Sequence, residues 1–523
     1  MAERGMAREM TARELLRWSW RQLTSMRTAL VLLFLLALAA VPGSVIPQED
    51  VDAFAVSRWQ DQHPTLTPVY EWLGMFSVFD SVWFSAIYLL LALSLVGCIV
   101  PRTGVYWRAC RAVPPAAPRN LTRLPDHTTY TTAETPQVVL ERARTVLQRR
   151  RFRLGGNPSA DDGADAVSAE RGYLREAGNL LFHVSVLVVL AGFAIGSLFG
   201  YQGGVIVVTD GAGFSNTPSQ YDDLSPGSLM DPDVMEPFTF DVTDFDIEWL
   251  LTGPRAGMAQ KFVAHLDYRE ERDGEQRSYD LRVNHPLTIG GTDVFLIGHG
   301  YAPYITVRDG NGDLAYAGPT IFLPEDQATF TSFGVVKAPD ARPQQIGLEG
   351  LLYPTFALVD GDPMSLFGDV RNPRISMLAH VGDLGMDGGD RQSVYVLDKD
   401  GTRQLENPDG TPFRVDLFVG ESVALPDGAG SVTFEGIQPW VRVQISRTPG
   451  KLVALTGVVL ALLGLLGSLF IRPRRVWVRA RRAPGGETLV EVAALDRSSG
   501  GDVAEELERI VAGLRPEEPE DEA

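Results

Sequence analysis

The stretch "GNLLFHVSVLVVLAGFAIGSLFG", residues 178–200, decides the fold of this chain. It contains no Asp, Glu, Lys or Arg. About 20 such residues, at 1.5 Å each, cross the hydrocarbon of a bilayer. The stretch therefore predicts a membrane-spanning helix over residues 179–201. A single ionisable side chain, His183, lies within it. Ionisable residues are unfavourable and rare inside membrane-spanning helices, so the presence of His183 needs an explanation.

Three further windows have the same composition, without any of the four charged residue types. They are residues 29–46, 82–100 and 452–471. Together the four windows predict an integral membrane protein with four transmembrane α-helices. The first window also resembles a secretory signal, because "ALAA" is similar to a cleavage site and Pro42 follows it. Its length and the second span after it favour an uncleaved helix.

The arginines predict the orientation of the chain. Residues 1–27 contain six Arg, residues 101–177 thirteen and residues 472–482 six, whereas residues 47–81 contain Arg58 alone. Because positive charge favours the cytoplasmic side, we expect a multi-pass protein of the plasma membrane with both termini in the cytoplasm. The cytoplasmic parts are then the N-terminus 1–28, the loop 101–178 and the tail 472–523. The extracytoplasmic parts are the loop 47–81 and the region 202–450.

Net charge and cysteine content exclude several classes of protein. The formal net charge of -19 at pH 7 makes nucleic acid an unfavourable partner, and the arginines are explained by the anionic inner leaflet of the lipid bilayer. The two cysteines, Cys98 and Cys110, form no C-x-x-C or C-x-x-C-H motif. The chain is therefore neither a thioredoxin-like reductant nor a c-type haem protein.

Two segments flanking the spans have recognisable patterns. Leu and Trp alternate with arginines in "ARELLRWSWRQLTSMR" (12–27), which predicts an amphipathic helix on the inner membrane surface. "TPQVVLERARTVLQRRRFRL" (135–154) predicts a small strand and helix element in the loop 101–178, without a catalytic grouping.

The outer loop 47–81 ends in an aromatic pattern. Trp72, Phe76, Phe79 and Trp83 recur at helical spacing. Such a stripe is more typical of packing at the bilayer surface or on neighbouring helices than of a cofactor site.

The region 202–450 changes to a period of two. Short segments rich in Val, Ile, Phe and Thr alternate with Gly, Pro and Asp, and examples are "FTFDVTDFDIEWL", "KFVAHLDYRE", "RSYDLRVN", "TDVFLIGHG", "RISMLAHVG", "RVDLFVG" and "SVTFEGIQPWVRVQIS". About a dozen strands at this spacing predict a large all-β, sandwich-like domain between the third and fourth helices.

Small residues line one face of each of the last two spans. Gly192, Gly196 and Gly200 recur every four residues in the third span, and Gly457, Ala461, Gly464 and Ser468 do so in the fourth. Small residues let helix backbones approach closely in lipid. We expect these faces to pack on each other or on a partner.

Among the histidines, His183 is the strongest candidate for a cofactor site. It lies about 6 Å past Asn179, near the cytoplasmic side, where a neutral imidazole is tolerated. Two interpretations stay open from the residues alone: a ring bonded to a carbonyl or reaching the interface, and an axial ligand of haem iron. His285 and His299 bracket "HPLTIGGTDVFLIGH" as the one notable outer pair.

No pattern of a catalytic site is present. The sequence has no G-x-S-x-G, P-loop, Rossmann or paired-metal motif. We therefore predict no catalytic residues, and a chain that is not an enzyme by itself.

Five segments, in order, resemble the ResB (CcsB) family of cytochrome c biogenesis proteins. They are "SMRTALVLLFLLALAAVPGSVIPQ" (25–48), "LGMFSVFDSVWFSAIYLLLALSLVGCIVPR" (73–102), "GNLLFHVSVLVVLAGFAIGSLFGYQG" (178–203), "VNHPLTIGGTDVFLIGHGYAP" (283–303) and "QISRTPGKLVALTGVVLALLGLLGSLFIRPRRVWVR" (444–479). They cover all four spans and the start and centre of the outer region.

The resemblance implies a subunit of the system II cytochrome c maturation machinery. Such a subunit acts with a ResC (CcsA)-like membrane partner, moves haem b transiently across the membrane and presents apocytochrome c, so that the complex is a holocytochrome c synthase. The family's membrane histidine corresponds to His183, as axial ligand of the haem iron. The tryptophan-rich haem-handling loop of the partner is absent here, and His285 and His299 are not part of the family pattern. The alternative is a membrane-anchored sensory or adhesion β module without a cofactor.

Overall fold

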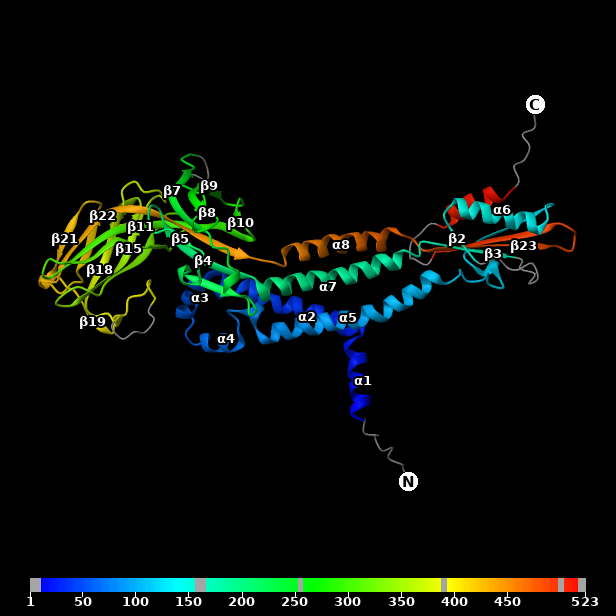
Figure 1. The fold of residues 1–523 in the computed structure, drawn as a ribbon, viewed down its shortest axis with the longest axis horizontal. Helices are drawn as coiled ribbons and strands as arrows, with labels where there is room; N and C mark the ends of the chain where they lie inside the picture. The colour runs from blue at the N-terminus through cyan, green and yellow to red at the C-terminus, as the bar shows by residue number, and fades with distance from the viewer. Residues whose placement is uncertain (1–10, 156–165, 253–256, 387–392, 497–502, 516–523) are drawn as a thin grey trace, which may run out of the picture. The chain divides into compact units, whose positions relative to one another are not determined.

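The chain divides into two compact units (Figure 1). The computed structural model describes residues 11–155, 166–252, 257–386, 393–496 and 503–515. Met1–Ala194 and Gly450–Ala523 form the first unit, and Ile195–Pro449 form the second. In sequence, the second unit is thus an insertion between two halves of the first.

Four apolar helices are long enough to cross a membrane. They are α2 (Met26–Val45), α5 (Val82–Arg111), α7 (Arg175–Phe199) and α8 (Lys451–Phe470). The most apolar window of each has a mean hydropathy between 2.2 and 2.4. Large side chains such as Phe34 and Phe470 are 67% and 76% exposed, an arrangement that lipid favours and water does not. The four predicted spans are therefore confirmed as apolar helices suited to a membrane.

Serine caps set where two of these helices begin. Ser25 Oγ accepts a hydrogen bond from the Thr28 amide at 3.2 Å, and Ser81 Oγ accepts one from the Phe84 amide at 3.3 Å. Each bond satisfies one of the backbone amide donors that the start of a helix leaves unpaired. At its other end α5 continues through Pro101 to Arg111, so the first part of the expected loop 101–178 is helical.

Helix α5 packs against Leu23 and Thr24, the residues just before α2, through small and polar side chains. Ser94 Oγ donates to the Leu23 carbonyl at 2.6 Å, and Cys98 Sγ donates to the Thr24 carbonyl at 3.0 Å. A Cβ added at Gly97 would lie 2.1 Å from Thr24 Cγ2. Glycine is therefore required at this crossing.

Helices α7 and α8 touch backbone to backbone. A Cβ added at Gly178 would lie 2.6 Å from the Ser468 nitrogen, at Gly192 2.5 Å from the Ala454 nitrogen, and at Gly464 2.5 Å from the Phe182 nitrogen. The expected small-residue contact between these helices is present at Gly192, Gly457 and Gly464. Gly196 and Gly200 lie instead against the Thr448 side chain and the Arg447 carbonyl, just before α8.

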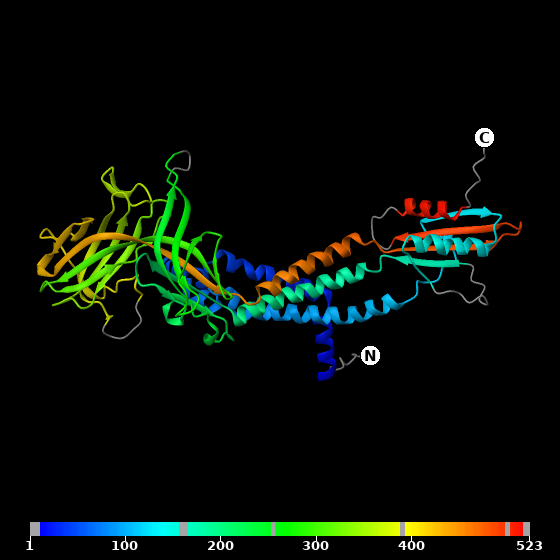
Figure 2. The ribbon, with the colours of Figure 1, turned by 45° about the horizontal axis from the view of Figure 1, so that its top comes forward.

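A small domain completes the first unit (Figure 2). Its five-stranded antiparallel sheet has the order β1-β24-β23-β3-β2. The elements of the small domain are β1 (Asp126–Thr132), α6 (Pro136–Arg149), β2 (Arg153–Leu154), β3 (Ala166–Arg171), β23 (Arg474–Arg482), β24 (Thr488–Asp496) and α9 (Ala504–Leu514). Strands and helices from the loop 101–178 and from the tail 472–523 thus form one domain, although the two segments are far apart in sequence.

Both faces of the small sheet are covered. Helices α6 and α9 bury Leu147, Ile510 and other side chains on one face. On the other face Trp477 Nε1 donates to the Pro115 carbonyl at 3.0 Å. Glu506 of α9 pairs with Arg171 of β3 at 2.8 Å and with Arg474 of β23. In sequence, β3 comes just before α7 and β23 just after α8, so these ion pairs connect α9 to both strands.

The remaining helices of the first unit are short. They are α1 (Ala12–Leu23), α3 (Glu49–Gln62), α4 (Thr67–Leu73) and the 3₁₀ turns η1 (Val78–Asp80) and η2 (Leu121–Arg123). Helix α1 has no buried residue and exposes Trp18 and Trp20 beside its arginines, as an amphipathic surface helix would.

The aromatic residues of the outer loop do not share one helix, which corrects the expected helical stripe. Gly74 ends α4 in the left-handed conformation, at φ 67°. Trp72, before it, is 83% exposed, whereas Phe76, after it, is buried against Trp59 with ring centroids 5.2 Å apart. Helical spacing in sequence did not reveal this break.

The second unit is a large β-rich domain of three main sheets and one hairpin. A seven-stranded sheet contains β4 (Tyr201–Val208), β6 (Asp223–Pro226), β10 (Leu287–Ile289), β11 (Thr292–Asp309), β12 (Leu314–Pro319), β21 (Ser422–Leu425) and β22 (Gly430–Arg447). A six-stranded sheet contains β13 (Leu323–Pro324), β14 (Ser332–Ala338), β15 (Gln345–Tyr353), β18 (Arg374–Asp383), β19 (Gly401–Gln404) and β20 (Arg414–Phe418).

A four-stranded sheet has the order β5 (Phe214–Ser215), β7 (Thr239–Trp249), β8 (Ala259–Arg269) and β9 (Arg277–Arg282). Strands β16 (Phe356–Val359) and β17 (Asp362–Ser365) form the hairpin. The complete 3₁₀ turns between strands in the described part of this unit are η3 (Pro218–Gln220), η4 (Pro232–Val234) and η6 (Pro426–Gly428).

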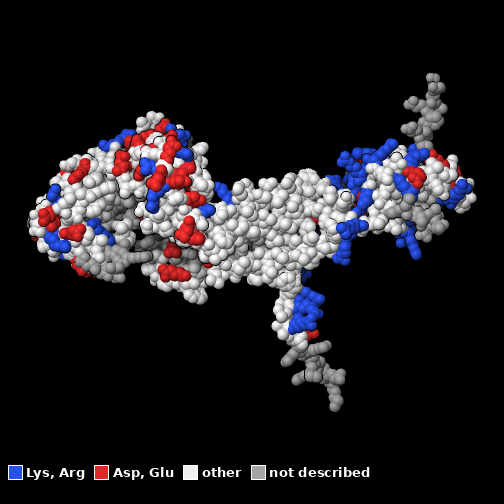
Figure 3. Space-filling model, viewed as in Figure 1, with Lys and Arg blue, Asp and Glu red and all other residues white. Residues whose placement is uncertain are grey.

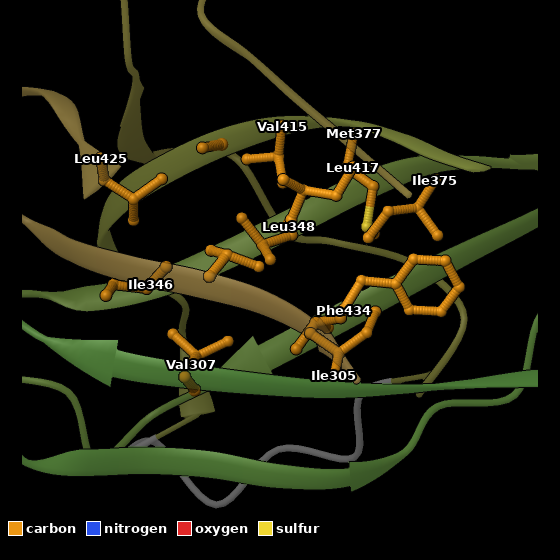
Figure 4. Packing of buried hydrophobic residues seen from close by; sticks show 14 of the residues in the cluster. Ile305, Val307, Ile346, Leu348, Ile375, Met377, Val415, Leu417, Leu425 and Phe434 are labelled. Carbon is orange, nitrogen blue, oxygen red and sulfur yellow. The ribbon is translucent and has the colours of Figure 1, made fainter. Parts of the chain in front are cut away.

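Two long strands, β11 and β22, belong to both cores of this unit. Each has 18 residues, and they pair antiparallel from Thr292↔Arg447 to Asp309↔Gly430. One half of the pair packs on the four-stranded sheet through Val294 and Val441. The other half packs on the six-stranded sheet, where Ile305 and Phe434 meet Leu348 (Figure 4). The predicted large β-rich domain is confirmed.

The glycine contact between α7 and α8 gives a stability prediction. Replacing Gly192 by Leu places side-chain atoms where the Ala454 backbone lies, so the helices must separate. We expect a loss of about 1–3 kcal/mol, as for other overpacked interiors. Thermal unfolding of the purified chain in detergent measures it.

Gly104 of α5 supplies the control. A Cβ there meets nothing within 4 Å, so Gly104→Leu lacks the steric penalty and gains helix propensity of about 0.5–1 kcal/mol. Equal destabilisation by both substitutions would contradict a specific contact at Gly192.

Candidate functional site

His183 lies on α7, eight residues after Arg175, the first residue of the helix. At 1.5 Å per residue it is about 12 Å along the helix axis from that end. Its Nδ1 is 2.8 Å from the Asn179 carbonyl oxygen, one turn earlier. Because a carbonyl only accepts, Nδ1 carries the proton and the lone pair of a neutral ring lies on Nε2.

The contacts of α7 with α8 and with α5 define the surroundings of His183. Phe182 and Val189 lie on the face that meets glycines of α8. On another side, Tyr88 of α5 donates to the Leu190 carbonyl. His183 precedes Leu190 by seven residues, or about two turns, so it lies on the same side of α7 as Leu190. The ring is half-buried and meets Phe182 edge-on at 5.4 Å.

Asn179 is the polar neighbour of His183 that the sequence pattern did not single out. Its carbonyl fixes the His183 tautomer, and its side-chain Oδ1 is buried without a hydrogen-bond partner among the described residues. A polar residue one turn before an ionisable one, inside an apolar run, was the available signal. Asn179 and His183 are thus two polar residues, one helical turn apart, within the apolar stretch of α7.

The histidines outside the spans have other partners. His63 Nδ1 bonds to the Trp59 carbonyl at 2.9 Å, and His127 Nδ1 bonds to the Leu124 carbonyl at 2.8 Å. His380 is buried, which lowers its pKa, and its Nε2 is 3.9 Å from Glu349 Oε1.

The predicted outer pair, His285 and His299, is not brought into one site. His285 lines a surface pocket of about 360 Å³ together with Tyr279 and Arg282. His299 lies among phenylalanine rings of the sheet interior. Across the described ranges, no group of three or more His, Cys, Asp or Glu side chains is placed to hold a metal ion.

His265 joins three neighbouring strands. Its Nε2 is 3.1 Å from Asp246 Oδ2 on β7, and its Nδ1 is 2.9 Å from Asp280 Oδ1 on β9. Both nitrogens therefore donate to carboxylates, which requires the imidazolium. The hydrogen bond with Asp246, followed by that with Asp280, raises the pKa of His265.

A sequence model of the ResB-like family matches residues 26–508. A protein named cytochrome c biogenesis protein CcsB, from Synechococcus elongatus, is 28% identical over 286 residues, which cover 52% of this chain and 56% of the relative. Proteins of the same name from Thermosynechococcus vestitus and Prochlorococcus marinus are 23% and 24% identical, and each match covers 54% of this chain and 60% of the relative. The matches thus span less than two thirds of these relatives.

The His265 contacts predict a pH dependence of stability. Because the folded-state pKa is raised, the stabilisation is fully present below the ordinary pKa of 6.5 and is lost as pH rises through the folded value. The melting temperature of the chain should exceed that of His265→Gln below the ordinary histidine pKa of about 6.5, and the difference should shrink as the pH rises above it through the raised folded-state pKa.

The control for this titration is His63→Gln, which removes a histidine whose Nδ1 bonds to a backbone carbonyl. Thermal unfolding at a series of pH values measures both variants. A difference between parent and His265→Gln that does not change with pH would contradict the ion-pair explanation.

Proposed function

The chain belongs to the ResB-like family, and on that premise we propose that it is a cytochrome c biogenesis protein. In this proposal it is a membrane subunit that acts with a ResC/CcsA-like partner in moving haem across the membrane and attaching it to apocytochrome c. The relatives that carry the name cytochrome c biogenesis protein CcsB support it. The lack of a catalytic grouping favours a subunit that positions molecules over one that ligates haem by itself.

Charge supports the proposed orientation in the plasma membrane. Lys and Arg gather on α1 and on the small domain, whereas Asp and Glu are spread over the β-rich unit (Figure 3). Positive charge is retained on the cytoplasmic side. The small domain and both termini are accordingly cytoplasmic, and the β-rich unit is extracytoplasmic.

His183 is the proposed axial ligand for haem in transit. The observation that carries this assignment is the hydrogen bond from Nδ1 to the Asn179 carbonyl, which leaves Nε2 as the free donor of a lone pair. Protein imidazoles that bind metals donate their other ring N–H in this way. A neutral imidazole also costs less in an apolar helix than a charged residue. The second axial ligand comes from the partner in this proposal.

The β-rich unit is proposed to present apocytochrome c. Extended peptides bind by adding a strand to an exposed sheet edge. Strand β9 ends the four-stranded sheet and pairs with β8 on one side. Its second side is the edge that we would test first for peptide binding.

Substitution of His183 tests the ligand assignment. We expect His183→Gly to lose most of the haem that co-purifies with the chain and its ResC-like partner, because the iron loses an axial nitrogen. Added imidazole should restore the Soret band, since the side chain is replaced by a space for the free ring. Visible spectra and pyridine haemochrome assays measure both effects.

His63→Gly is the matched control, because its Nδ1 bonds to the carbonyl four residues earlier in the same way. Haem content should not change in this variant. Unchanged haem in His183→Gly would remove the ligand role, and normal covalent haem in c-type cytochromes after gene deletion would favour a membrane-anchored β module without a cofactor.

A further inference from the structure

Helix α4 has one packed face and one exposed apolar face. Tyr70 turns toward α3, where its ring centroid is 4.7 Å from that of Trp59, and Glu71 accepts a hydrogen bond from Gln60 Nε2 at 3.2 Å. Another face carries large apolar side chains, which we call the α4 stripe. They are Leu66, Val69, Trp72 and Leu73, and their spacing of three and four residues places them on one side of the helix.

The α4 stripe is unfavourable in water. Its four side chains are between 36% and 83% exposed, and Trp72 is the most exposed of them. Single exposed apolar residues are common on protein surfaces, but a contiguous group on one short helix marks a contact with a membrane or with another protein. The position of the helix and the charge of the loop decide between these two.

Contacts at the end of α4 place the stripe beside the membrane-spanning helices. The Leu73 carbonyl accepts a hydrogen bond from Nε1 of Trp83, in the first turn of α5, at 2.8 Å. The Met75 carbonyl accepts one at 3.0 Å from Nε2 of Gln48, which follows the end of α2 by three residues. Helix α4 is therefore fixed between the end of α2 and the start of α5 (Figure 1).

The ends of the two spans are themselves apolar and exposed. A Cβ added at Gly43 would lie 2.7 Å from Phe79 Cζ, so the ring of Phe79 packs on the last turns of α2. Val45, the last residue of α2, and Val82, the first residue of α5, are 78% and 86% exposed. Both belong to helices suited to a membrane. The α4 stripe thus continues the lipid-facing surface of these spans at the level where they leave the bilayer.

The charge of the outer loop decides the kind of attraction to a membrane. Residues 47–81 contain six Asp or Glu and one Arg, Arg58. Anionic lipid attracts basic segments and does not favour such an acidic one. Tryptophan is enriched at the membrane–water interface, where one part of its ring is in apolar and another in polar surroundings. The loop is therefore suited to attachment by apolar burial, which needs no charge on the lipid.

We propose that α4 lies at the membrane–water interface, with the α4 stripe inserted between the lipids of the leaflet in which α2 ends and α5 begins. In the proposed orientation this is the outer leaflet. The packed face of α4 then holds the aromatic cluster of Trp59, Tyr70 and Phe76 at the membrane surface. This lipid contact is independent of haem and of the role of His183.

Fluorine NMR of the full chain in phosphatidylcholine nanodiscs tests the contact. The nine tryptophans are replaced by fluorotryptophan, and the signal missing from Trp72→Phe is that of Trp72. Phosphatidylcholine with a doxyl spin label on its acyl chain near the headgroup should remove the Trp72 signal, whereas a gadolinium chelate in the water should leave it visible. Val69→Trp should add a signal with the same behaviour, because Val69 belongs to the stripe.

Ser57→Trp is the matched control, because Ser57 is exposed beside Arg58 on α3. Its added signal should be lost with the gadolinium chelate and should persist with the doxyl lipid. Exchange of part of the phosphatidylcholine for anionic phosphatidylglycerol should change neither result. Since all three substitutions are at exposed or half-buried positions, thermal unfolding of the variants should match that of the parent.

Three results would overturn the proposal. The first is loss of the Trp72 signal to the gadolinium chelate without an effect of the doxyl lipid. The second is a Trp72 signal that the doxyl lipid reaches only when phosphatidylglycerol is present, because the attachment would then depend on charge. The third is protection of Trp72 from both agents when the ResC-like partner is added, because the stripe would then contact a protein. None of them affects the haem spectra of His183→Gly, so the two proposals fail separately.

Discussion

The backbone contact between α7 and α8 is the constraint on which the first unit depends. Gly178, Gly192, Gly457 and Gly464 let the two helices meet without side chains between them. In lipid this close approach replaces the hydrophobic drive that water would supply. The strands that flank the helix pair are also partners, β3 with β23 and β4 with β22. A pair of hydrogen-bonded strands therefore adjoins α7 and α8 at each end, and this pairing fixes the register of the two helices.

The position of the proton on His183 is set within α7 alone. The bond from Nδ1 to Asn179 is internal to α7 and needs only a regular helix. His265, by contrast, has a carboxylate at each nitrogen and is a cation. The same side chain is therefore a lone-pair donor or a cation according to what its two nitrogens meet.

Sequence alone could predict the spans and the strand segments, because long apolar runs and period-two patterns are local signals. It could not predict the small domain, since Arg171 and Arg474 pair across some 300 residues of chain. His183 could be selected by residue type, but which of its two nitrogens is free depends on the hydrogen bond between Nδ1 and the Asn179 carbonyl. The expected aromatic stripe was wrong because one glycine, Gly74, ends α4 before Phe76, and the shift in the register of β11 with β22 between Leu296 and Gly298 left no sequence signature.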